Sequence, residues 1–178
     1  MPQDNTPYEE HRQTARNIIL RQLSAAPKSR HQLTQKLIER DIPEDVIEEV
    51  LDRFEEVELI DDASFAEMWV RSRHRAKGLA RRALSMELKQ RGIEGHQAEA
   101  ALEQVTDDDE WTTAHELVSK KLSRASIPSS SDPADRKQRD RMVRRLVGML
   151  SRKGYPSGLA FSVVTDAMNA ADLDHLDE

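Results

Sequence analysis

Apolar residues recur at intervals of three and four along most of the chain, with polar and charged residues between them. This spacing is typical of amphipathic helices, whose apolar side chains share one face, whereas a half-buried strand would alternate strictly. Runs of β-branched residues are few, and the hairpin dipeptides Asn-Gly and Asp-Gly are absent. The pattern therefore predicts an all-α protein.

An internal repeat follows from the same pattern, because three segments align without gaps. They are LTQKLIERDIPEDVIEEVL from Leu33, LSMELKQRGIEGHQAEAAL from Leu84 and LVGMLSRKGYPSGLAFSVV from Leu146. Each segment begins with two leucines four residues apart, the buried stripe of a helix, and ends with a second apolar stripe. All three predict the same unit, which is a helix, a tight turn and a second helix.

One position in the repeat is expected to form the turn between the two helices. It holds Asp41, Gly92 and Gly154. Glycine adopts the left-handed conformation that ends many helices without a Cβ penalty, and aspartate tolerates it less well. Pro43 and Pro156 stand two residues further on, where proline is able to open the next helix.

A further helix is expected before each pair. The first is expected to run from about Glu9, the second to start at Asp61 or Asp62, and the third to follow Thr106. Their expected inner faces are Ala15, Ile18, Ile19 and Leu23; Phe65, Met68, Trp69 and Ser72; and Trp111, Ala114, Leu117, Val118 and Leu122. The residues expected to cap helices are Asp61 and Asp62, Ser29 with Gln32, and Asp132.

These elements predict a tandem array of three three-helix repeats that forms an elongated, curved, solenoid-like protein. The expected divisions are a disordered N-terminus at 1–8, helical repeats at 9–56, 57–105 and 106–170, and an acidic C-terminal tail at 171–178. The third repeat is longer by eleven residues, which are assigned to a flexible loop at about 125–135. The alternative is one compact bundle in which the similarity of the segments is accidental.

Composition supports a thin helical layer over one thick core. Of the 178 residues, 34% are charged and 37% are apolar. The absence of cysteine excludes disulfides and cysteine-bound metal sites. No apolar run reaches the length of a membrane span, and the polar N-terminus lacks the apolar stretch of a signal peptide. We therefore expect a soluble, cytoplasmic protein that does not contact membranes.

Charge is distributed in blocks. Residues 44–67 hold eleven acidic residues and one basic residue, whereas residues 71–91 and 136–153 each hold eight basic residues and one acidic residue. Such blocks often lie on solvated helix faces. Two separate basic blocks in a chain of net charge −6 also suggest an anionic partner that is bound through selected surfaces.

The usual signatures of catalysis are missing. The chain has neither a phosphate-binding loop of the form GxxxxGK[ST] nor a GxGxxG motif, and its six histidines are isolated from one another. We therefore expect no enzyme activity, no catalytic residues, no metal, no cofactor and no small-molecule substrate.

The basic blocks supply the candidate binding residues. Clustered arginine and lysine suit either the phosphate backbone of a nucleic acid or an acidic groove of a protein. The candidates are Arg71, Arg73, Arg75, Lys77, Arg81, Arg82, Lys89, Arg91, Arg141, Arg144 and Arg145.

The middle repeat carries a family resemblance. The segments IDDASFAEMWVRSR from Ile60 and GLARRALSMELKQRGI from Gly78 resemble the RecX family of bacterial regulators of the RecA recombinase. The shared residues are Asp61, Asp62, Phe65, Ala66, Trp69, Val70 and Arg73, followed by Gly78, Arg82, Leu84, Glu87, Leu88, Arg91, Gly92 and Ile93. The repeat layout extends the resemblance over roughly residues 10–168. Asp41, where the family usually has glycine, and the Ser/Pro-rich loop of the third repeat depart from the pattern.

The resemblance implies an all-helical, non-enzymatic protein that binds the RecA–DNA filament and inhibits its recombinase and coprotease activities. Within the motif, Phe65 and Trp69 are expected to pack in the core, with a role as partner anchors as the alternative. A second interpretation of the whole chain stays open, which is a stand-alone helical nucleic-acid-binding protein acting through its basic clusters. Binding to the filament, compared with binding to naked single- or double-stranded DNA, separates the two.

Overall fold

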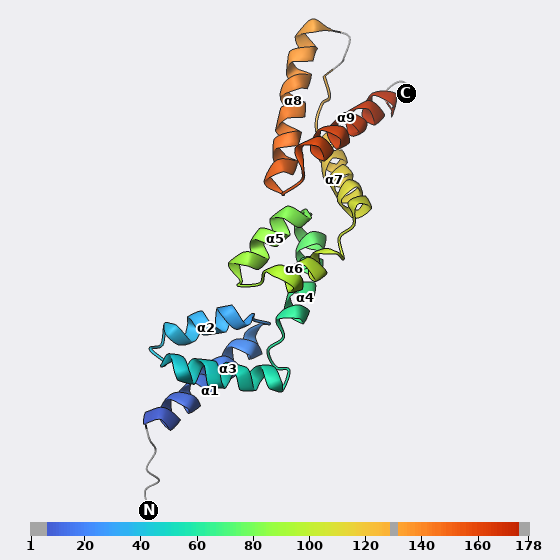
Figure 1. The fold of residues 1–178 in the computed structure, drawn as a ribbon. Coiled ribbons are helices and arrows are strands. Elements are labelled where there is room, and N and C mark those ends of the chain that lie inside the picture. The colour runs from blue at the N-terminus through green and yellow to red at the C-terminus, as the bar shows by residue number, and fades with distance from the viewer. Residues whose placement is uncertain (1–6, 129–131, 175–178) are drawn as a thin grey trace, which may run out of the picture. The chain divides into compact units, whose positions relative to one another are not determined.

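The structure, a computed structural model, describes residues 7–128 and 132–174 (Figure 1). The described residues form helices and no strand, in agreement with the predicted all-α class. The helices are α1 (Pro7–Ala25), α2 (Arg30–Ile38), α3 (Glu44–Glu56), α4 (Asp62–Lys77), α5 (Arg81–Gln90), α6 (Gly95–Leu102), α7 (Asp107–Leu122), α8 (Pro133–Arg152) and α9 (Ser157–Asp174). They follow the predicted order of three helices in each repeat.

The repeat pattern has the expected structural meaning. All six repeat leucines are buried, with at most 6% of any side chain exposed. The turn between the second and third helices of each repeat passes through a residue with positive φ, which is 55° at Asp41, 73° at Gly92 and 92° at Gly154. The predicted left-handed turns are therefore confirmed in all three repeats.

Several element boundaries differ from the expectation. Helix α1 begins at Pro7 rather than near Glu9, so the last two residues of the predicted disordered segment are helical. Helix α9 continues to Asp174, within the predicted tail, and α8 already begins at Pro133, within the predicted loop. Residues 125–128 of the predicted loop belong to no helix, whereas residues 1–6, 129–131 and 175–178 lie outside the described residues.

Several helices begin at a capping group, and of these Ser29 with Gln32 and Asp132 were expected from the sequence. Ser29 and Gln32 form a reciprocal capping box at α2, and Thr106 forms one with Asp109 at α7. Asp132 caps α8. Pro43 stands at the start of α3, as expected, one residue before the helix, and its carbonyl accepts a hydrogen bond from the N–H of Ile47 (3.0 Å).

The chain divides into two compact units. Unit 1 comprises the chain through Trp69 together with Glu87–Ala101, and unit 2 comprises Val70–Met86 together with the chain from Leu102 onward. In unit 1, α1, α2 and α3 enclose one apolar core, and in unit 2, α7, α8 and α9 enclose another. The described residues therefore contain separate cores in the two units, and the elongated outline stays a prediction.

Two inner faces were assigned wrongly. Met68 and Trp111 are 37% and 39% exposed, although both were expected inside their helices. In α4 the neighbouring Ala66 and Val70 are buried instead. In α7 the interior position belongs to Glu110, which is only 3% exposed. A buried carboxylate requires a partner, and that partner belongs to the contact between repeats.

Candidate functional site

The N-terminus of α2 is held by groups from the second repeat, all within unit 1. The backbone N–H of Arg30 donates to Asp62 Oδ1 (2.8 Å), and Ser29 Oγ donates to the carbonyl of Arg91 (2.7 Å). Ser29 is completely buried. Burial raises the pKa of Asp62, although the hydrogen bond from Arg30 opposes this shift. Asp62, which was expected to cap its own helix, therefore caps α2, and Asp61 caps α4 through the N–H of Ser64 (3.0 Å).

The N-terminus of α5 is held in the same way by the third repeat, within unit 2. The backbone N–H of Arg81 donates to Glu110 Oε1 (2.8 Å), and the N–H of Ala80 donates to the carbonyl of Lys153 (2.9 Å). Ala80 and Arg81 occupy the places of Ser29 and Arg30 in the repeat alignment, and Lys153 occupies the place of Arg91. We call these two equivalent contacts the first joint and the second joint.

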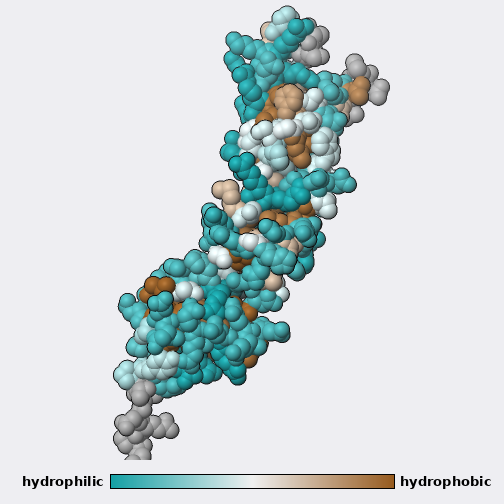
Figure 2. Space-filling view, viewed as in Figure 1, coloured by the Kyte–Doolittle hydropathy of each residue, from teal (hydrophilic) through white to brown (hydrophobic). Residues whose placement is uncertain are grey.

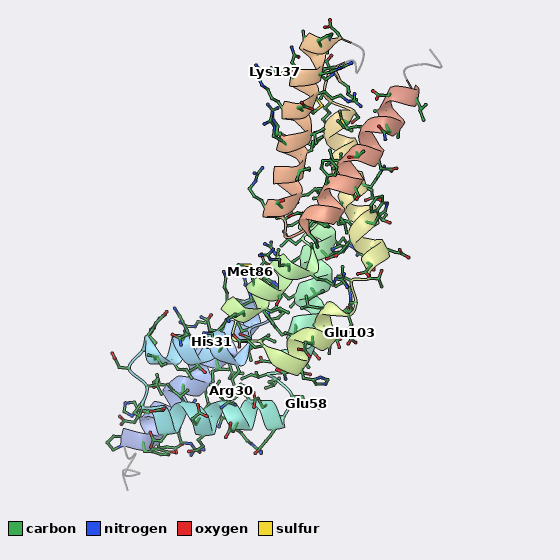
Figure 3. All side chains as sticks on the ribbon, turned by 45° about the horizontal axis from the view of Figure 1, so that its top comes forward. Arg30, His31, Glu58, Met86, Glu103 and Lys137 are labelled. Carbon is green, nitrogen blue, oxygen red and sulfur yellow. The ribbon has the colours of Figure 1, made fainter. Side chains whose placement is uncertain are left out.

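Glycine is required at both joints because the preceding repeat approaches the turn closely. A Cβ atom on Gly92 would lie 2.3 Å from the Cβ of His31, and one on Gly154 would lie 2.6 Å from the backbone nitrogen of Ala83. Figure 3 labels His31, together with Arg30, on α2. Asp41, at the same place in the first repeat, has an exposed side chain, so its Cβ is accommodated.

The arginine side chains at the joints neutralise carboxylates inside the molecule. Arg30 pairs with Glu48, Asp52 and Glu55 of α3, each at 2.9 Å. Arg12 of α1 pairs with a fourth carboxylate of this helix, that of Glu49 (3.0 Å). Arg12 and Arg30 therefore pair with four of the eleven carboxylates of the acidic block.

Arg81 and Arg91, two of the candidate binding residues, contact groups that stabilise the fold. Arg81 pairs with the buried Glu110 (3.0 Å), and hydrogen bonding to this carboxylate raises the pKa of the arginine. The guanidinium of Arg91 lies 3.6 Å from the centre of the Trp69 ring and donates to the carbonyl of Glu87 (2.8 Å). Reversing the charge of either arginine would therefore disturb the fold as well as any surface contact.

The other candidates are distributed over both units. Lys89 lies in unit 1, where its exposed side chain is 3.7 Å from Glu94. Those of unit 2 lie at the end of α4, at the start of α5 and along α8; they are Arg71, Arg73, Arg75, Lys77, Arg82, Arg141, Arg144 and Arg145. Arg73 is half-buried and the other seven are exposed. Within residues 7–128 and 132–174, Arg75, Lys77 and Arg82 pair with no carboxylate.

Comparison with known proteins assigns the chain to a family. The family description "RecX, first three-helix domain" matches residues 15–54, and "RecX, second three-helix domain" matches residues 61–102. A Regulatory protein RecX from Streptomyces coelicolor is 46% identical over 164 residues, which cover 91% of this chain and 82% of the relative. The chain belongs to the RecX family.

Other RecX proteins agree in sequence and in fold. The Regulatory protein RecX of Thermobifida fusca is 46% identical over 160 residues, covering 90% of this chain and 82% of the relative. The crystal structure of RecX from Lactobacillus salivarius superposes with a TM-score of 0.72, covering 89% of this chain and 97% of that one, at 22% identity. The relatives are named as regulatory proteins, which agrees with the expectation of a non-enzymatic role.

Several RecX motif residues of this chain lie at or beside the first joint. Asp62 caps α2, Gly92 admits His31, and Phe65 stacks on Trp69 with ring centres 5.8 Å apart. Phe65 is 5% exposed, which supports core packing over a role as partner anchor. These motif residues therefore stabilise the contact between the first and second repeats.

The sequence contained a signal for both joints that was missed. Arginine occupies the first position of α2 and of α5, and an acidic residue, Asp62 or Glu110, lies in the first turn of the first helix of the following repeat. Within the described residues, no group of three or more His, Cys, Asp or Glu side chains is arranged to hold a metal ion. In the same ranges, no helix is both long enough and apolar enough to cross a membrane.

Proposed function

We propose that this RecX-family protein binds the RecA recombinase–DNA filament and inhibits its ATPase, strand-exchange and coprotease activities. In this role it would modulate recombinational repair and the SOS response in the cytoplasm, without catalysis of its own. The observation that carries the proposal is the 46% identity to a Regulatory protein RecX over 91% of the chain.

The distribution of charge supports a partner that combines protein and nucleic acid. Unit 1 carries 10 Lys/Arg and 19 Asp/Glu, a net charge of −9, whereas unit 2 carries 17 and 14, a net charge of +3. A filament of protein on DNA presents both protein surface and phosphate, so one chain with an acidic and a basic part suits it better than it suits bare DNA.

Co-sedimentation with preformed RecA filaments tests the proposal. At about 0.15 M salt, where exposed charges are screened beyond about 8 Å, we expect the protein to sediment with filaments and to lower their ATP turnover. Binding to naked single-stranded DNA that equals binding to the filament, with ATP turnover unchanged, would favour the stand-alone nucleic-acid-binding protein instead.

A double charge reversal at Arg75 and Arg82 locates the contact. Both side chains are exposed and lie outside the joints, so Arg75→Glu/Arg82→Glu should retain the wild-type circular dichroism while binding the filament more weakly. Each surface charge contributes only about 0.2–1 kcal/mol, which is why two are changed together. The matched control is Arg21→Glu/Arg40→Glu, which reverses two exposed arginines of unit 1 and should leave inhibition unchanged.

A further inference from the structure

The third repeat differs from the others by the length of its second helix. Helices α2 and α5 begin at Arg30 and Arg81, and the equivalent position in the third repeat is Val143. Helix α8 instead begins at Pro133, ten residues earlier. Residues 133–142 therefore form a helical extension that the second helices of the other two repeats lack, and its first three residues fall within the predicted loop.

The inner side of α8 packs against the core of unit 2. Leu146 and Leu150 are buried in its core, and Met142 and Val143 pack against the same core. One arginine of the extension, Arg139, points inward as well, because its guanidinium forms two hydrogen bonds with the carboxylate of Asp172 on α9 (2.6 and 3.0 Å) and a third with the carbonyl of Pro128 (3.2 Å). The extension is thereby held against α9.

The outer side of α8 carries basic residues at helical spacing. We call it the α8 basic face, and its members are Lys137, Arg141, Arg144, Arg145 and Arg152. All five are exposed, and none pairs with a carboxylate in the described parts of the chain. At a rise of about 1.5 Å per residue, Lys137, Arg141 and Arg145 follow one another at about 6 Å along the helix axis, and Arg152 lies about 10 Å beyond Arg145. Figure 2 shows hydrophilic side chains along this side of α8, and Figure 3 shows Lys137 pointing away from α9.

We propose that the α8 basic face binds the phosphate backbone of DNA. The inference deepens the proposed function, on which it rests, by assigning the DNA of the filament to this helix. Phosphate contacts require only arginine and lysine at regular spacing, whereas the core of a protein interface needs apolar or aromatic side chains. No large apolar residue of α8 is exposed, and the helix belongs to the unit with positive net charge.

The salt dependence of binding to a single-stranded oligonucleotide measures the contact directly. The full chain is titrated by fluorescence anisotropy between about 50 and 200 mM salt, where each phosphate contact adds about 0.7 to the negative slope of log K against log salt. The variant Lys137→Gln/Arg141→Gln/Arg145→Gln removes three members of the face, so we expect the slope to become shallower by about 2. Arg21→Gln/Lys28→Gln/Arg40→Gln removes three charges from unit 1 and should keep the wild-type slope.

The outcomes separate this inference from the proposed function. A wild-type slope in the α8 variant, or no binding of DNA by the wild type at about 50 mM salt, overturns the inference. Loss of filament binding with the oligonucleotide slope unchanged also overturns it, since the face would then contact an acidic protein surface. The α8 variant could show a shallower slope with the oligonucleotide while the wild type fails to inhibit the recombinase. That result supports the phosphate contact and contradicts the proposed function. Helicity measured by circular dichroism confirms that the variants are folded.

Discussion

Replacement of Gly92 by alanine adds one methyl group to a turn that serves two purposes. The residue has a φ of 73°, in the left-handed region, and its Cβ position lies 2.3 Å from the Cβ of His31. The Cβ of His31 is fixed to the backbone of α2, so no rotamer change relieves the overlap. The N-terminus of α2 has to move away from the turn, and the first joint opens with it.

The expected cost has two parts. Left-handed backbone costs a residue with a Cβ about 1–2 kcal/mol. Forcing an extra methyl group into a packed contact costs about 1–3 kcal/mol more. The displacement also lengthens the hydrogen bond from the buried Ser29 Oγ to the carbonyl of Arg91, now 2.7 Å. We therefore expect Gly92→Ala to lower the free energy of unfolding by about 2–5 kcal/mol.

Gly95 provides the matched control, because it isolates the backbone part. Its φ is 59°, but a Cβ there would meet no atom within 4 Å. Gly95→Ala should therefore cost only about 1–2 kcal/mol. Urea unfolding followed by circular dichroism measures the difference between the two variants, which reports the packing of the first joint. Adding His31→Gly to Gly92→Ala should recover part of the loss, because it removes the clashing Cβ. Equal costs for Gly92→Ala and Gly95→Ala would refute the close approach.

Three further predictions concern the joints and caps. Arg81→Ala leaves the buried carboxylate of Glu110 without its ion pair and should cost about 2–3 kcal/mol of unfolding free energy in a urea titration, whereas the exposed neighbour Arg82→Ala should stay within about 0.5 kcal/mol. Ser29→Ala should cost about 1–2 kcal/mol, since it removes a helix cap and a buried hydrogen bond together. The hydrogen bond from the backbone N–H of Thr106 lowers the pKa of Asp109. The ionised carboxylate of Asp109 therefore stabilises the fold above its unfolded pKa, and this stabilisation is lost as the pH falls through the folded pKa. Asp109→Asn should therefore lower the melting temperature at neutral pH and reduce its decline below about pH 4.

Local features of the sequence predicted the helices and their turns, because both depend on neighbouring residues. The repeat leucines identify buried stripes, and Gly92 and Gly154 identify the left-handed turns, without reference to the rest of the chain. The capping pair of Ser29 and Gln32 is equally local. Each of these features places its interacting groups within a few residues of one another, where spacing alone is informative.

The spacing of residues along the sequence could not predict the contacts between repeats. Asp62 and Glu110 each satisfy a backbone N–H that lies about thirty residues earlier, at Arg30 and Arg81. For the same reason Trp111 was expected in the interior of α7, where apolar character favours it over a carboxylate, although Glu110 holds that place. Arg81 was likewise treated as a surface contact because its acidic partner was unknown. Hydrogen bonds and ion pairs between distant residues determine which side chains are buried at these positions, and hydrophobic periodicity carries no information about them.

The two ends of the array differ from its joints in ways that the joints explain. At each joint the N-terminus of a second helix lies against the turn of the following repeat, and the turn residue is a glycine that could not carry a Cβ. In the first repeat that place belongs to Asp41, whose side chain is exposed, so the requirement for glycine is absent. In the third repeat α8 continues through Val143, the position where a joint would begin, and the N–H groups that a further repeat would receive are already bonded within the helix. Asp41, which departs from the family pattern, therefore keeps the left-handed turn, with a φ of 55°, at a place where the close approach that excludes a Cβ at Gly92 and Gly154 does not occur.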